Sequence, residues 1–201
     1  MSHHMRHPAV RTSDDLLDQE GIRDLVRQAY RAVIGTTTGV AGRLYTPEQL
    51  RLLPPGAVAQ ALGVGNPVRA AALAPGEVVI DLGCGGGIDT ILAAHAVAPD
   101  GRAIGLDMLP EMLAVAARNA AAAGVTNVEW LQGQIEAIPM PEASVDAVIS
   151  NGVINLSPRK SRAFAEVFRI LRPGGRMVVA DIVVDEDLPP QVLTSAAAWA
   201  G

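Results

Sequence analysis

Short apolar runs alternate with helical stretches from about residue 70 to the end of the chain. The first run, EVVIDLG (77–83), is rich in β-branched residues and ends in glycine, which predicts a buried strand. Four further strands are predicted at RAIGLDM (102–108), NVEWLQG (127–133), VDAVIS (145–150) and RMVVADIVV (176–184). Helices are predicted between the strands, the last at SRAFAEVFRILRPGG (161–175). Such alternation forms right-handed βαβ units, so we expect an α/β, doubly wound, mainly parallel sheet in the order 3-2-1-4-5.

The 201 residues are enough for one domain with a small appendage. We expect a flexible N-terminus over residues 1–12 and a lid of helices and loops over 13–70. A cofactor-binding core follows over 71–184, and residues 185–201 form a C-terminal helix or a truncated end. Within the lid, one helix is predicted from Ser13 to about residue 34, and one short helix near 47–53.

Composition excludes several classes of protein. The net charge of −5, with no cluster of Lys or Arg, argues against nucleic acid as a partner. No apolar run approaches the ~20 residues of a membrane span, and the N-terminus lacks a signal pattern. The one cysteine, Cys84, excludes a disulfide framework and a thiolate zinc site, and a free thiol fits the cytoplasm. His3, His4 and His7 could suggest a metal, but we expect a loose end and no metal site.

Glycines follow the first predicted strand in DLGCGGG, which contains Asp81, Gly83, Cys84, Gly85 and Gly87. A phosphate-binding P-loop is excluded because no lysine follows the last glycine, and a dinucleotide fingerprint is excluded because its third glycine is missing. An acid followed by G-x-G-x-G instead suits S-adenosylmethionine, which carries an ammonium, a sulfonium and a ribose diol but no phosphate. The glycines would let the backbone approach this ligand.

The ends of the next three predicted strands supply further candidates, because ligands bind at the carboxyl ends of such sheets. Asp107, with Met108 beside it, can accept hydrogen bonds from both ribose hydroxyls, although a helix N-cap is an alternative role. Gln134 and Ile135 lie where the adenine would be held. Asn151, in SNGVIN, is expected to face the methionine end of the cofactor and the incoming substrate.

These motifs resemble class I S-adenosylmethionine-dependent methyltransferases, and over residues 20–200 the chain is similar to the arsenite methyltransferase family. The resemblance rests on the glycine-loop segment and on GLDMLPEMLAVAARNA, GQIEAIPMPEASVDAVISNGVINLSPRK and LRPGGRMVVADIV. It implies a Rossmann-like methyltransferase core. Tyr30 resembles a tyrosine that closes over the cofactor in relatives, although core packing is an equal alternative for it.

The resemblance also implies three arsenic-binding cysteines, which this chain lacks. Their positions are Val64, Gly152 and a place beyond Gly201. A soft metalloid needs thiolates, so we expect transfer to a small organic molecule, with Asn151 and Tyr30 in positioning roles and no identified base. The alternatives are a catalytically inactive S-adenosylmethionine-binding paralogue or subunit, and an arsenite methyltransferase that uses external thiols.

The last predicted strand would be an open apolar edge, because strands 6 and 7 of the resembled fold are missing from the sequence. Open edges are a liability in solution. We therefore expect this edge to be covered by a second copy of the chain in a homo-oligomer, by the N-terminal segment, or by the rest of a longer protein.

Overall fold

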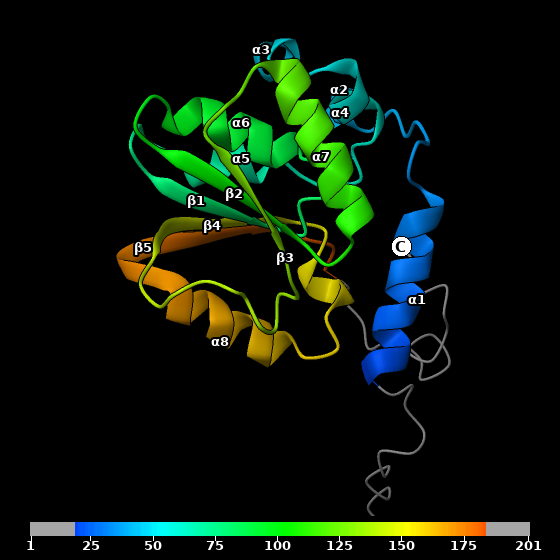
Figure 1. Ribbon diagram of the computed structural model, residues 1–201, viewed down its shortest axis with the longest axis vertical. Helices are drawn as coiled ribbons and strands as arrows, with labels where there is room; N and C mark the ends of the chain where they lie inside the picture. The colour runs from blue at the N-terminus through cyan, green and yellow to red at the C-terminus, as the bar shows by residue number, and fades with distance from the viewer. Residues whose placement is uncertain (1–18, 184–201) are drawn as a thin grey trace, which may run out of the picture.

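A parallel sheet forms the centre of the computed structural model, which describes residues 19–183 (Figure 1). Its order is β3-β2-β1-β4-β5, and every pairing is parallel, as the sequence predicts. The five strands are β1 (Val78–Leu82), β2 (Arg102–Asp107), β3 (Val128–Gln132), β4 (Val145–Asn151) and β5 (Leu171–Ala180). Because β1 pairs with β2 on one side and β4 on the other, the order of the strands reverses at β1.

Helices cover both faces of the sheet (Figure 1). On one face lie α5 (Pro67–Ala71), α6 (Ile88–Val97) and α7 (Pro110–Ala123), and on the other lies α8 (Lys160–Ile170). Each face has its own core, one built largely from Ala, Val, Leu and Ile and the other from Val, Leu and Ile. The helix α6 is apolar on nearly all sides because it is buried between the sheet and the lid.

The lid contains more helix than the sequence predicts. Besides α1 (Gln19–Ala32), it has α2 (Ala41–Leu44), α3 (Pro47–Arg51) and α4 (Pro55–Ala59) before α5, whereas only one short helix was expected at 47–53. Proline at the first helical position starts three of these turns. Thr46 closes a capping box on α3, and Asn66 caps α5 by accepting the Arg69 amide. These single-turn helices are too short to show a helical period in the sequence.

The boundary between α8 and β5 differs from the prediction. The helix ends at Ile170 rather than in the Pro-Gly-Gly segment, and β5 already begins at Leu171. The register against β4 shifts between Val145 and Ala147, so the extended Leu171–Gly175 stretch is taken up as an irregularity of the ladder. Proline and two glycines end a helix on sequence grounds, but they also fit an edge strand with such an irregularity.

The β5 edge has β4 as its only strand neighbour among residues 19–183. Val179 of β5 is 38% exposed, and Phe168 of the preceding helix α8 is 85% exposed. Coverage of this edge stays a prediction, and residues 1–18 and 184–201 lie outside the described part of the chain. Within that part, none of the helices combines the length and apolar character needed to cross a membrane.

The packing of β2 against its neighbours gives a stability prediction. A Cβ added at Gly105 would lie 2.5 Å from the Trp130 ring and 3.0 Å from Cys84 Sγ, so we expect Gly105→Ala to lower the free energy of unfolding by about 1–3 kcal/mol. Gly42→Ala is the matched control, because nothing lies within 4 Å of its added Cβ and α2 is helical there. Urea unfolding should show the control unchanged or up to about 1 kcal/mol more stable. Equal effects of the two variants would contradict this packing.

Candidate functional site

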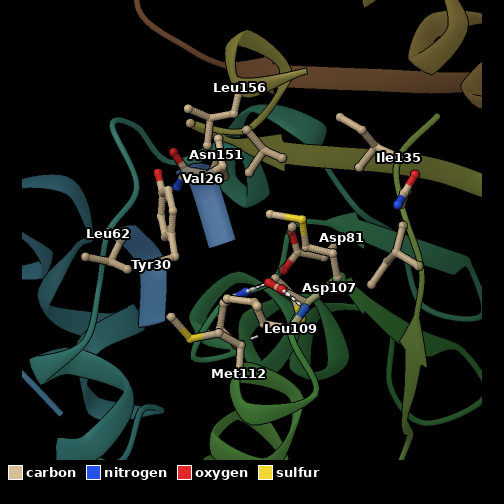
Figure 2. Close-up of a pocket in the computed structure, with 18 of the residues that line it drawn as sticks. Val26, Tyr30, Leu62, Asp81, Asp107, Leu109, Met112, Ile135, Asn151 and Leu156 are labelled. Atoms are coloured by element: carbon tan, nitrogen blue, oxygen red, sulfur yellow. Dashed lines mark hydrogen bonds between the residues drawn. The ribbon is translucent and has the colours of Figure 1, made fainter. Parts of the chain in front are cut away.

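A cavity opens at the carboxyl ends of β1, β2 and β4, where the strand order reverses (Figure 2). It brings together the predicted site residues with one exception, Gly87. The lining includes Tyr30, Asp81, Gly83, Cys84, Gly85, Asp107, Met108, Gln134, Ile135 and Asn151. These residues come from α1 and from the segments after four different strands, so the fold unites positions up to about 120 residues apart in the sequence.

The glycine loop runs tightly across the ends of β1 and β2. The amides of Gly83 and Cys84 both donate to the Leu106 carbonyl, at 2.8 and 2.9 Å. Gly83 has φ +70°, and a Cβ there would lie 2.5 Å from the Val153 side chain. Gly87 lies outside the lining and begins α6, where a Cβ would be 2.9 Å from that of Ala116. Gly87 therefore allows close packing of α6 and α7, and its predicted cofactor contact stays a prediction.

Asp107 holds the glycine loop and the start of α7 at once. One of its carboxylate oxygens accepts the Gly85 amide at 3.0 Å, and the other accepts the Leu109 amide at 2.9 Å. The bond to Leu109 closes a turn just before α7, whose N-cap is Leu109 and has no side-chain cap, so the N-cap role considered for Asp107 is not formed. Burial raises the pKa of Asp107 despite these hydrogen bonds. Each oxygen retains a lone pair for a further donor from the cavity.

Asp81 is a buried carboxyl at the end of β1. Its partner is the Thr90 hydroxyl, which donates to it at 2.6 Å. Burial, followed by the negative charge of Asp89, raises the pKa of Asp81 to about 8. Asp81 faces the cavity and forms no ion pair within residues 19–183, so this buried acid is suited to a positively charged ligand group.

A second buried acid, Asp89 in the first turn of α6, was not predicted as a site residue. It accepts the Tyr45 hydroxyl at 3.0 Å through both oxygens and the Asn151 side-chain amide at 2.9 Å. Burial raises the pKa of Asp89 to about 6 and, together with the charge of Asp89, raises that of Tyr45 well above its usual range. The signal in the sequence was an aspartate directly after the glycine loop, at the start of an otherwise apolar helix.

The end of the cavity opposite the glycine loop is lined largely by apolar side chains, with Asn151 beside them. Figure 2 shows Val26 and Tyr30 of α1 together with Leu62 and Leu156 around this end. Burial, and then the charges of Asp181 and Asp107, raise the pKa of Tyr30, so its phenol stays protonated at neutral pH. The Tyr30 hydroxyl makes no hydrogen bond within residues 19–183, and the ring lines the cavity.

The two positions at which the resemblance implies cysteines meet at this end of the cavity. A Cβ added at Gly152 would lie 3.7 Å from Val64 Cγ1. The cysteine that is present, Cys84, is buried on the glycine-loop side, where burial and the charges of Asp81 and Asp107 raise its thiol pKa well above the usual value. Among residues 19–183 there is also no cluster of three His, Cys, Asp or Glu side chains that could hold a metal.

The family model that matches the chain is described as a methyltransferase domain, and it covers residues 73–201. Among curated proteins, an arsenite methyltransferase of Halobacterium salinarum is 50% identical over 131 residues, which are 65% of this chain and 34% of that relative. A demethylmenaquinone methyltransferase of Symbiobacterium thermophilum is 36% identical over 105 residues, or 52% of this chain and 42% of the relative. The matched part of the chain thus covers less than half of the length of either relative.

Solved structures give the same picture. The arsenic(III) S-adenosylmethionine methyltransferase CrArsM of Chlamydomonas reinhardtii is similar with a TM-score of 0.60 and 36% identity. The match covers 82% of this chain and 52% of that one. A methyltransferase of Aquifex aeolicus, at 21% identity and a TM-score of 0.55, shares the fold.

The buried acids predict an unusual pH dependence of stability. The unfolded chain ionises its aspartates near pH 4, whereas folded Asp81 keeps its proton up to about pH 8 and Asp89 up to about pH 6. The folded state therefore binds more protons over this window, and its stability falls as the pH rises. We expect the free energy of unfolding in urea to drop by on the order of 5 kcal/mol between about pH 5 and about pH 8.

Asp81→Asn should flatten this slope. Asp146→Asn is the control, because the pKa of Asp146 is lowered and the effect of its titration lies below this window. A wild-type protein whose stability rises from pH 5 to pH 8 would contradict the burial of these acids in their protonated form.

Proposed function

The chain belongs to the methyltransferase-domain family, and we propose that it transfers the methyl group of S-adenosylmethionine to a small organic acceptor. The predicted cofactor is confirmed by this membership and by the match to a solved S-adenosylmethionine methyltransferase. The observation that carries the proposal is the two-part cavity. Its glycine-loop part is lined by carboxyl and amide groups, and its other part is apolar and without thiols in the described chain.

The polar part of the cavity fits the cofactor group by group. We assign the ribose hydroxyls to Asp107, whose oxygens have lone pairs to spare, and the adenine to Gln134, Ile135 and Met108. The α-ammonium is assigned to Asp81, since a cation would offset the burial of that carboxylate. The backbone at Gly83, Cys84 and Gly85 would approach the cofactor closely. Gly87 lets α6 pack closely on α7 next to this loop.

Methyl transfer needs alignment more than proton transfer. The bound cofactor supplies a methyl carbon activated by a sulfonium, and the acceptor displaces the thioether from it. Val26, Leu62 and Leu156 would exclude water from the acceptor, and Tyr30 would cover the site from α1. Within residues 19–183 the acceptor end offers no unpaired carboxylate or histidine as a base. The proposal therefore favours acceptors that are already nucleophilic, such as phenolates, quinols, enolates or neutral amines.

Arsenite is the competing acceptor, because relatives of this chain carry that activity in their names. The geometry supports an organic acceptor instead. Positions 64 and 152 lie close enough to share a ligand, yet one is valine and the other glycine. Cys84 lies on the cofactor side, and its thiol is held in the protonated form, which binds arsenic poorly. Arsenite methylation at this site would have to draw its thiols from outside residues 1–201.

Proton release on binding tests the assignment of Asp81. At about pH 6.5 the carboxyl is protonated in the free protein, and a bound ammonium would lower its pKa and expel close to one proton. Calorimetry with S-adenosylmethionine in buffers of different ionisation enthalpy measures that number. Asp81→Asn should release none and bind more weakly, and Glu166→Gln, a change on α8 outside the cavity lining, should behave as the wild type. Binding without proton release in the wild type would contradict the assignment.

An acceptor panel tests the activity itself. We expect S-adenosylhomocysteine to form with a phenol or a naphthohydroquinone and not with arsenite alone. Formation only with arsenite plus glutathione would instead support the external-thiol alternative. Cofactor binding without turnover across the whole panel would support a catalytically inactive cofactor-binding protein. No binding at about 1 mM S-adenosylmethionine would refute both methyl transfer and the non-catalytic role.

A further inference from the structure

The side-chain amide of Asn151 is fully engaged by other parts of the protein. Its Oδ1 accepts the backbone amides of Val64 and Gly65, at 2.8 and 3.0 Å. Its Nδ2 donates to the Gly65 carbonyl and to Asp89, both at 2.9 Å, and lies 3.3 Å from the Tyr45 hydroxyl. Both lone pairs and both protons thus have partners. One side chain at the end of β4 holds a loop that is 86 residues away in the sequence.

The loop rests directly on this amide. A Cβ added at Gly63 would lie 2.2–2.7 Å from the Asn151 amide atoms, which leaves no room for a side chain. Leu62 and Gly63 line the acceptor end of the cavity, and Val64 faces Gly152. The placement of the Asn151 amide therefore decides the position of one wall of the cavity.

Asp89 in turn orients the Asn151 amide. An amide can be turned by 180° so that oxygen and nitrogen exchange places, and only one orientation can serve the Val64 and Gly65 amides. The Asp89 carboxylate accepts only, so it requires the nitrogen on its side. Tyr45 donates to the same carboxylate and holds it from the lid. Asp89 is buried, so water does not compete for these bonds.

We propose that Asp89 is a positioning residue, which orients Asn151 and thereby fixes the loop of residues 62–66 as the wall of the acceptor site. The three residues Asp89, Asn151 and Tyr45 form the loop clamp. The functional meaning of the clamp rests on the proposed methyl transfer, whereas its existence does not. It sets which side chains at positions 64 and 152 reach the acceptor, and it leaves the glycine loop to hold the cofactor.

Swapping the acid and the amide between positions 89 and 151 tests the clamp. Asn151→Asp alone places two carboxylates in contact, so we expect the Val64 and Gly65 amides to exchange with solvent about tenfold faster or more. Adding Asp89→Asn restores a donor opposite the new carboxylate, which can still accept both loop amides. The double variant should therefore recover most of the protection, although the Gly65 carbonyl loses its donor. Hydrogen exchange followed by NMR on the ligand-free protein measures both.

The control is Glu166→Gln, which perturbs another buried acid that accepts a backbone amide, that of Ile138. It should leave Val64 and Gly65 protected, which separates loss of the clamp from general loss of stability. S-adenosylhomocysteine serves as probe of the cofactor end, and Glu166→Gln should bind it within about threefold of the wild type. The proposal is overturned if Asn151→Asp leaves both amides protected from exchange. It is also overturned if adding Asp89→Asn to that variant does not restore their protection. Failure of the wild type to bind the probe would count against the proposed function and not against the clamp.

Discussion

The two-sided hydrogen bonding of β1 is the constraint on which the site depends. β1 pairs in parallel with β2 on one side and with β4 on the other, so the carboxyl ends of these two strands flank its own. After β2 the chain continues into α7 on one face of the sheet, and after β4 it continues to the opposite face. The cavity lies between these two connections. Asp81, Asp107 and Asn151 are close in space because they lie at or next to the carboxyl ends of three neighbouring parallel strands. No direct attraction between them is needed, and two of them are acids that repel each other.

The cost of this arrangement is the burial of carboxyl groups. Asp81 lies near the end of β1, before the glycine loop, and Asp89 lies in the first turn of α6, after it. Burial raises the pKa of both carboxyl groups. A protein without a ligand would gain by replacing them. Their presence is therefore better explained by what they bind and orient than by stability. The two acids divide the work, since Asp81 faces the polar end of the cavity and Asp89 is occupied by the loop clamp.

The strands, their order and most of the cavity could be predicted from the sequence, because buried parallel strands leave continuous apolar runs and their ends carry glycine or acid. The short helices α2 to α5 could not, since a single turn shows no period and is fixed by tertiary contacts such as those of Asn66. Leu171–Gly175 was assigned to a helix end because proline and glycine have the same local meaning in both settings. Asp89 and Tyr45 were missed because their role exists only once residues from the lid, α6 and β4 meet.

The loop that the clamp holds also touches the last residue of the edge strand. A Cβ at Gly65 would lie 2.6 Å from that of Ala180, and Arg176 bonds the carbonyls of Ala71 and Ala72 at the end of α5. The loop of residues 62–66 therefore packs directly against β5. A displacement of β5 at Ala180 would have to move Gly65 as well, and with it the loop that lines the cavity. The selectivity of such a site can change through substitutions on an outer edge that never contact the acceptor.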